Sequence, residues 1–256
     1  MTDHSEKVET YFNKNADEWH DLYIKPRNAN DIVLKNRMDI SLSFLQKYLP
    51  TGSKILDAGC GAGLLSDNLA SLGYIIHGVD ISPTMVEMCT NHFNKRFPNN
   101  NPHRFSAGDI SSLNLPKNSF DAVAALGFLE YQENETPSLE FFHSLLKPGG
   151  FLVITGPLKT SIALAMSQTV SKLTKKPDPR PSISIHLYSP SRFKELLEPA
   201  GFEIKEINRH GFASFPIFGG GRKGILLHKT LSGMSKVLPI KALCNDIVVA
   251  AQKKEH

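Results

Sequence analysis

The sequence predicts an α/β fold, with a doubly wound parallel sheet covered by helices on both faces. Two observations carry this prediction. Between residues 50 and 157, short apolar runs alternate with stretches of helical length and pattern, as in chains that form parallel sheets. The glycine-rich segment "GCGAG" at 59–63 follows the first apolar run and precedes a helical stretch, which is typical of a turn that cradles a nucleotide.

The first fifty residues predict two helices, at 5–23 and 30–49. Pro50 and Gly52 end the second of them. After these helices the strands are expected at 54–59, 74–80, 103–109, 120–129, 151–157, 202–215 and 244–254, and the helices at 63–73, 82–97, 136–150 and 189–201. The helix at 82–97 has the clearest start signal, with Ser82 as N-cap and Pro83 at its first position.

Two segments do not fit the alternation, and we interpret both as candidate substrate caps at the sheet edge. They are 158–189 and 216–241. The second holds Leu226, Leu227, Met234 and Val237 among lysines. A helix resting on a membrane surface would have this composition. A plain edge helix explains it better, so peripheral membrane contact is not favoured.

Composition favours a cytoplasmic globular protein of 256 residues with 41% hydrophobic residues, enough for a sizeable core. The polar N-terminus does not resemble a signal peptide, and no apolar run approaches the ~20 residues that a membrane span needs. The three cysteines, Cys60, Cys89 and Cys244, are too few and odd in number for a disulfide framework.

Charge is unevenly distributed along the chain. Residues 1–150 carry a net charge of −5 and residues 151–256 a net charge of +9. Nucleic-acid binders usually show a strong basic stripe with aromatic residues, so this distribution disfavours a nucleic-acid partner. The basic half could face an anionic substrate or a membrane surface, although a solvated lysine-rich face is the better interpretation.

The glycine run departs from the two common phosphate-binding motifs. Leu64 stands where a dinucleotide fingerprint has its third glycine, and the chain contains no Gly-Lys pair for a P-loop. Asp57 precedes the first glycine by two residues and would repel a pyrophosphate but attract an ammonium or sulfonium group. Asp80 ends the second strand, where nucleotide-binding folds place the carboxylate that accepts the ribose hydroxyls. Asp109 follows the third strand and is placed for an adenine edge.

These features together resemble the class I S-adenosylmethionine-dependent methyltransferases. The resemblance covers about residues 50–157 and lies in "ILDAGCGAG", "VDIS", "AGDI" and "LLKPGGFLVIT". It resumes at "HLYSPSRFKELLEPAGFEI", a segment that is similar to small-molecule methyltransferases of ubiquinone and menaquinone biosynthesis. It implies S-adenosylmethionine as cofactor and a Rossmann-like, mostly parallel sheet of seven strands. The last strand would be antiparallel and inserted beside the fifth, which suits the closing strands 202–212 and 244–253.

The resemblance also implies a cofactor site. The methionine part would be held by Asp57, Gly59, Gly61 and Gly63, the ribose by Asp80, the adenine by Ile81, Met85, Asp109 and Ile110, and the methyl group would lie beside Leu126 and Gly127. Residues 1–50 would form a helical lid on a methyltransferase domain spanning 51–256. Tyr11, Trp19 or Tyr23 would then cover the cofactor, and Arg37 would pair with its carboxylate. A helix packing its aromatic stripe on the core is an equally open alternative.

The sequence offers two candidate residues for the acceptor side of the site, His186 and Tyr131. His186 matches a histidine common in the resembling group and is expected to act as a general base or substrate contact, or else to orient the cap. Tyr131, in "LEYQE", replaces a histidine frequent in the family and would shape the acceptor pocket.

We see no metal-ligand cluster in the sequence. The expected reaction is methyl transfer to a small, apolar or aromatic metabolite at oxygen. Transfer to nitrogen or carbon, an NAD-binding oxidoreductase and a non-catalytic S-adenosylmethionine-binding protein remain alternatives.

Overall fold

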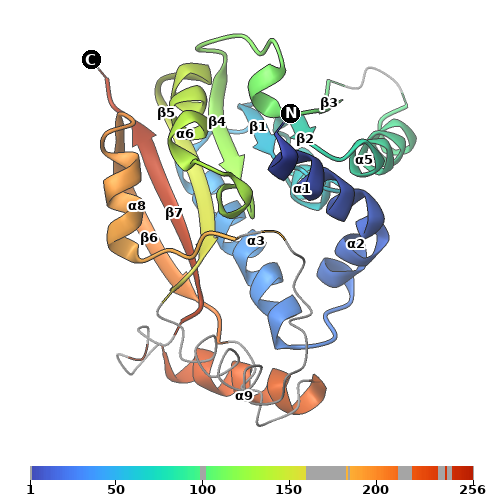
Figure 1. Cartoon of the computed structure of the whole chain (residues 1–256), viewed down its shortest axis with the longest axis vertical. Helices are drawn as coiled ribbons and strands as arrows, with labels where there is room; N and C mark the ends of the chain where they lie inside the picture. The colour runs from blue at the N-terminus through green and yellow to red at the C-terminus, as the bar shows by residue number, and fades with distance from the viewer. Residues whose placement is uncertain are drawn as a thin grey trace.

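The computed structural model describes residues 2–98, 102–159, 183, 185–212, 221–235, 240 and 244–255 (Figure 1). The strands are β1 Lys54–Ala58, β2 Ile75–Asp80, β3 Arg104–Ala107, β4 Phe120–Ala125, β5 Leu146–Pro157, β6 Phe202–His210 and β7 Asp246–Lys253. The α-helices are α1 Asp3–Lys14, α2 Ala16–Ile24, α3 Ala29–Tyr48, α4 Leu64–Ser71, α5 Pro83–Arg96, α6 Glu135–Leu145, α8 Pro190–Leu197 and α9 Gly221–Met234, and two short 3-10 helices are η1 Ile110–Ser112 and η2 Leu129–Tyr131.

The strands form one seven-stranded sheet in the order β3-β2-β1-β4-β5-β7-β6. The pairs among β1 to β5 are parallel, and β7 lies antiparallel between β5 and β6. This is the mostly parallel, doubly wound sheet that the sequence predicts, with the inserted antiparallel last strand. The strand order reverses between β1 and β4, and in such sheets the crevice outside the carboxyl ends of these strands is the usual ligand site.

Helices cover both faces of the sheet and give it two apolar layers (Figure 1). On one face, α3, α4 and α5 bury Leu45, Leu69 and Phe93 against the sheet. On the other face, α6 and α8 bury Phe142 and Phe193. Because α3 belongs to the first layer, only α1 and α2 of the predicted 1–50 lid lie outside it, and Tyr23 of α2 packs against that layer.

Several predicted boundaries differ from the structure. The strands expected at 120–129 and 202–215 end earlier, at Ala125 and His210. The single helix expected at 5–23 is two helices, because the chain leaves helical geometry at Asn15, whose side-chain amide donates to the Tyr11 carbonyl at 2.7 Å. The helix expected to run to residue 150 ends at Leu145. Pro148 disfavours helical geometry in the residue before it, and residues 146–150 instead extend β5, with an irregular register against β4.

The two predicted caps are only partly described. Most of 158–189 lies outside the described residues. Within 216–241, the structure describes α9, which lies beneath the sheet in the view of Figure 1 and packs on α3. The buried His228 ring of α9 contacts the Asn36 amide at 3.3 Å, whereas Leu226 is 67% exposed. None of the described helices is both long and apolar enough to cross a membrane.

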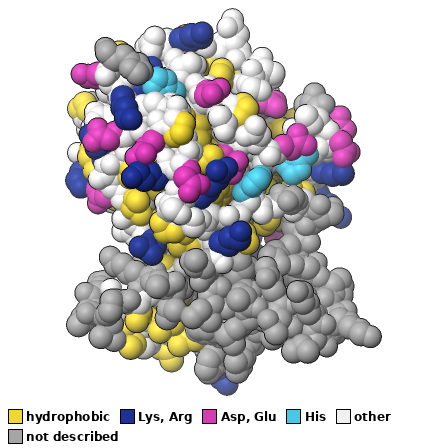
Figure 2. All heavy atoms as spheres, turned by 60° about the vertical axis from the view of Figure 1, so that its left-hand side comes forward, with side chains coloured by type: hydrophobic (Ala, Val, Ile, Leu, Met, Phe, Trp, Pro, Cys, Tyr) yellow, Lys and Arg dark blue, Asp and Glu magenta, His cyan; other side chains and the backbone are white. Residues whose placement is uncertain are grey.

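Charges on the described surface are mixed. In the view of Figure 2, lysine and arginine side chains lie beside aspartate and glutamate side chains across the coloured part of the face. No large area of a single sign is visible among the described residues on that face. Among the described residues of this face, the uneven charge of the two halves of the sequence does not produce a basic stripe.

Candidate active site

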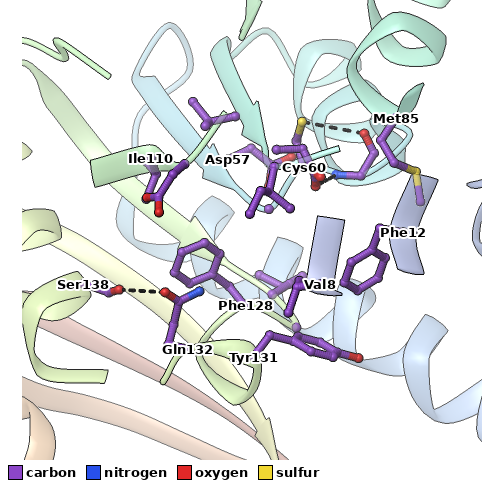
Figure 3. Close-up of a pocket in the computed structure, with 18 of the residues that line it drawn as sticks. Val8, Phe12, Asp57, Cys60, Met85, Ile110, Phe128, Tyr131, Gln132 and Ser138 are labelled. Atoms are coloured by element: carbon purple, nitrogen blue, oxygen red, sulfur yellow. Dashed lines mark hydrogen bonds between the residues drawn. The ribbon is translucent and has the colours of Figure 1, made fainter. Parts of the chain in front are cut away.

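A cavity of about 430 Å³ lies at the carboxyl ends of β1, β2 and β4, where the strand order reverses (Figure 3). Its walls come from the loops after these strands, from α1 and α2, and from the segment around η2. The predicted cofactor residues that line it are Asp57, Gly59, Gly61, Asp80, Ile81, Met85, Asp109, Ile110, Leu126 and Gly127. They meet because parallel strands place their carboxyl ends at the same sheet edge.

Asp57 lies inside β1, one residue before its carboxyl end. Its side chain is almost fully buried, and its Oδ2 accepts a hydrogen bond from the Ser66 hydroxyl at 2.7 Å. Burial raises the pKa of Asp57 to about 7, against the opposing effect of the Ser66 hydrogen bond. A cation bound beside this carboxylate would restore its charged form.

Asp80 holds the glycine loop in place. Its Oδ2 accepts the Gly61 N–H at 2.8 Å and its Oδ1 accepts the Ser82 N–H at 2.9 Å. Burial raises the pKa of Asp80, while these two N–H groups lower it. A carboxylate oxygen has two lone-pair sites, so each oxygen keeps one for a ligand hydroxyl.

The third acidic side chain stands at the start of η1. Asp109 Oδ1 accepts from the backbone N–H of Ser111 at 2.9 Å and from its hydroxyl at 2.7 Å. Ile110 and Met85 are buried and add apolar surface to the same part of the cavity. A carboxylate flanked by apolar side chains suits a flat, nitrogen-bearing ring.

Gly63, the remaining predicted cofactor residue, does not line the cavity but lets the loop enter α4. It has φ +86°, and a Cβ there would lie 2.3 Å from the Cys89 Sγ of α5. Gly52 has nearly the same φ, +89°, but open space around it. Substitutions at the two glycines would therefore cause the same backbone strain, but only the one at Gly63 would also meet α5.

Gly63→Ala is expected to destabilise the protein more than Gly52→Ala does. Left-handed geometry costs a non-glycine residue roughly 1–2 kcal/mol, which applies to both variants. Overpacking against Cys89 adds roughly 1–3 kcal/mol at position 63 alone. Thermal unfolding of both variants, each with and without Cys89→Ala, measures the difference, and equal losses in both backgrounds would contradict the contact.

Aromatic residues of α1, α2 and η2 form the opposite wall. Phe12 lies edge to face with Tyr131, with 5.2 Å between ring centroids (Figure 3). The Phe12 ring is also tilted against the Trp19 ring, with 5.6 Å between centroids. Of the predicted lid and pocket residues, Trp19, Tyr23 and Tyr131 line the cavity. Tyr11 is not in the wall and packs against the Phe12 ring at 5.2 Å.

Arg37 does not reach the cavity wall and is engaged elsewhere. Its Nη2 and Nε donate to Asp246 Oδ2 at 2.6 and 3.1 Å, and its Nη1 donates to Glu130 at 3.4 Å. All three side chains are buried. Burial alone would lower the pKa of Arg37, but the two carboxylates outweigh it and raise that pKa. The guanidinium therefore forms an internal ion pair. It lies close behind Gly127, because a Cβ added at Gly127 would be 3.0 Å from Arg37 Nη1.

His186 also lies outside the wall of the cavity. Its ring Nδ1 is 3.6 Å from Glu135 Oε1, and its backbone N–H donates to the Glu130 carbonyl at 2.9 Å. Its side chain is 38% exposed. This position ties the C-terminal end of the first predicted cap, 158–189, to the segment that contains η2.

Several residues in the wall carry no sequence signal that predicts a site. His4 and Val8 come from a polar, mixed helix, and Phe128, Gln132 and Ser138 follow β4 without a motif. Phe128 lies close to the glycine loop, since a Cβ at Gly59 would be 3.2 Å from its ring. Gln132 contacts Ser138 at 3.3 Å across the same wall (Figure 3).

The charge of the wall is one-sided. Four carboxylate side chains line the cavity, namely Asp57, Asp80, Asp109 and Glu133, and among the described residues in this wall there is no lysine or arginine. Such a wall repels phosphate groups and attracts a cation. Within the described ranges, no three histidine, cysteine or acidic side chains group closely enough to hold a metal ion.

Comparison with known proteins agrees with this geometry. A family model described as a methyltransferase domain matches residues 33–207. The chain is 28% identical over 163 residues to a ubiquinone biosynthesis O-methyltransferase of Xanthomonas axonopodis pv. citri, covering 62% of this chain and 66% of that protein. It is 30% identical over 163 residues to the mitochondrial ubiquinone biosynthesis O-methyltransferase of Schizosaccharomyces pombe, covering 63% of this chain and 59% of that protein. The matches thus span less than two thirds of these relatives' lengths.

A solved structure extends the likeness of the fold to nearly the whole chain. Magnesium protoporphyrin IX methyltransferase from Synechocystis, determined with bound S-adenosylhomocysteine, superposes with a TM-score of 0.70 over 98% of this chain and 100% of that one, at 19% identity. The sheet with its inserted antiparallel strand and the family match over more than half of the sequence lead to one assignment. The chain belongs to the methyltransferase-domain family, within the class I S-adenosylmethionine-dependent methyltransferases.

Proposed function

We propose that this chain binds S-adenosylmethionine and transfers its methyl group to the hydroxyl oxygen of a small, apolar or aromatic metabolite. The observation that carries the proposal is the cavity wall with four carboxylates and, among its described residues, no lysine or arginine. A sulfonium nucleoside is attracted by such a wall, whereas the pyrophosphate of NAD is repelled. This separates the proposal from the oxidoreductase alternative.

The residues present fit the cofactor part by part. The loop at Gly61 has open space where a Cβ would stand, so a ligand can approach its backbone closely. Asp80 would accept the ribose hydroxyls with its remaining lone pairs, and Asp109 would accept from the adenine amino group beside Ile110. Asp57 would face the positively charged methionine part.

The chain's own residues would then act mainly by orientation and exclusion of water. Bound S-adenosylmethionine supplies a methyl group already activated by a positively charged sulfur. The rings of Phe12, Phe128 and Tyr131 enclose the remaining space with apolar surface, which holds an aromatic acceptor and keeps water out. Such alignment can supply roughly 7–11 kcal/mol of the barrier. Similarity to ubiquinone biosynthesis O-methyltransferases supports oxygen as the acceptor atom.

Calorimetric titration of the purified protein tests the cofactor assignment. We expect micromolar binding of S-adenosylmethionine and S-adenosylhomocysteine and no binding of NAD. Incubation with labelled S-adenosylmethionine and a panel of hydroxyl, amine and carbon acceptors then tests the reaction. Binding of NAD alone would contradict the proposal, and binding without methylation of any acceptor would favour a non-catalytic binding protein.

The affinity for S-adenosylmethionine is expected to rise with pH and to level off near pH 7. The pKa of Asp57 is about 7 in the free protein because the side chain is buried. A nearby cation favours the carboxylate, so below pH 7 binding must first displace a proton. Each pH unit below 7 should therefore weaken binding by up to roughly tenfold. Titration from pH 5 to 8 measures this, and Asp57→Asn is the control that should bind more weakly but without the same slope.

A further inference from the structure

The two ends of α1 are hydrogen-bonded to opposite sides of the cavity. Near its C-terminal end, the Ser82 hydroxyl and the Thr84 N–H donate to Asn13 Oδ1 at 2.6 and 3.3 Å. At its first turn, the His4 ring contacts the Tyr131 carbonyl through Nε2 at 2.8 Å. The helix therefore spans the cavity from the start of α5 to η2, and His4 is fixed in the wall at one end of it.

The partner of His4 determines which ring nitrogen carries the proton. A backbone carbonyl can only accept a hydrogen bond, so Nε2 must be the N–H donor. In the neutral ring, Nδ1 then has a free lone pair. An imidazole held by a carbonyl on one nitrogen and unprotonated on the other has the arrangement that general bases use.

The surroundings of His4 belong to the acceptor side of the cavity. The carboxylates assigned to the cofactor lie at the carboxyl ends of β1 and β2 and just after β3, whereas His4 contacts η2, which follows β4. The same wall combines the Phe12 and Tyr131 rings with the polar side chains of Gln132 and Asn134. Asp3 and Lys7, the charged neighbours of His4 on α1, pair with each other at 2.5 Å, and Glu133 is the charged group of the facing loop.

We propose that His4 is the general base of the reaction and that its substrate is a phenolic hydroxyl. This rests on the proposed function. As the acceptor oxygen forms its bond to the methyl carbon, its proton passes to His4 Nδ1, and the electron pair of the broken carbon–sulfur bond stays on sulfur. The Tyr131 carbonyl stabilises the imidazolium that results. The Phe12 and Tyr131 rings of the same wall hold the phenol ring, which makes a catechol or phenol the acceptor class.

The kinetic test compares two acceptors that differ in acidity, catechol and 4-nitrocatechol. His4→Gln is expected to lower kcat for catechol by roughly 100-fold, the lower end of what a general base supplies. The loss for 4-nitrocatechol should be much smaller, because its hydroxyl ionises more readily without help. KM for S-adenosylmethionine should stay within about threefold. His92→Ala, at an exposed histidine of α5, is the matched control and should retain the wild-type rates.

A second variant separates base catalysis from the loosening of α1. Asn13→Ala removes the hydrogen bonds at the other end of the helix and leaves His4 in place. If His4 acts only by holding α1, then Asn13→Ala should lower kcat for catechol as much as His4→Gln does. In each variant, kcat should then fall by the same factor for catechol and for 4-nitrocatechol. That result would overturn the proposal, as would a loss in His186→Ala without one in His4→Gln.

A spectroscopic measurement tests the proton transfer without turnover. The absorption of 4-nitrocatechol reports whether its hydroxyl is ionised. In the complex with S-adenosylhomocysteine at fixed pH, we expect a larger ionised fraction in the wild type than in His4→Gln. Equal fractions, or no binding of 4-nitrocatechol, would overturn the role of His4 or the phenolic acceptor. Failure of the proposed function appears separately, as an absence of S-adenosylmethionine binding by the wild type.

Discussion

Asp80→Ala is expected to weaken the binding of S-adenosylmethionine by roughly 100-fold or more, the equivalent of two charge-assisted hydrogen bonds lost to the ribose. The variant also removes the acceptor of the Gly61 and Ser82 N–H groups, so the glycine loop loses its anchor. Both effects act on the cofactor and neither requires an acceptor substrate. Calorimetric titration with S-adenosylmethionine and S-adenosylhomocysteine measures the change.

Two further variants define the origin of this loss. Asp80→Asn keeps the size of the side chain and one carbonyl oxygen, so it should lie between the wild type and Asp80→Ala. Asp39→Ala removes an exposed carboxylate of α3 that pairs with Lys35 at 2.9 Å, and it should bind like the wild type. Binding by Asp80→Ala within threefold of the wild type, with an unchanged melting temperature, would show that the ribose lies elsewhere.

The sheet and the acidic residues that line the cavity could be predicted because their signals are local. Each strand in the alternating strand and helix pattern corresponds to an apolar run in the sequence. The acidic residues Asp57, Asp80 and Asp109 each lie where such a run ends. Parallel pairing alone then brings these ends together. The inserted antiparallel strand was different, since it followed from the family resemblance and not from the local pattern of 244–254.

The cavity wall formed by α1 and η2 could not be predicted, because its contacts join residues that are distant in the sequence and follow no motif. His4 lies in a polar helix, and its ring contacts the Tyr131 carbonyl, 127 positions away. Arg37 was expected to meet the cofactor, yet its partners are 93 and 209 positions away and take its hydrogen bonds inside the protein. No periodicity in a single sequence encodes such pairings, which depend on how α3 crosses the sheet.

The most destabilising single change that we predict is Arg37→Ala. It leaves the buried carboxylates of Asp246 and Glu130 without their counter-charge. Breaking a buried ion pair on one side costs roughly 3–5 kcal/mol, which for a chain of this size corresponds to a fall of roughly 10 °C in Tm. Lys35→Ala is the matched control, because it removes an exposed ion pair on the same helix and should change stability by less than about 1 kcal/mol.

The pH dependence of this loss distinguishes charge from packing. Burial raises the pKa of both Asp246 and Glu130, and Arg37 opposes that rise. Without the guanidinium, both folded-state pKa values should rise further above their unfolded values. Such groups favour the folded state most when they are protonated, so stability is retained at low pH and lost as pH rises through the folded pKa. The deficit of Arg37→Ala relative to the wild type should therefore be smaller at pH 5 than at pH 8, as measured by thermal unfolding. A deficit that is equal at both pH values would mean that Arg37 contributes through its packed side chain, and not through its charge.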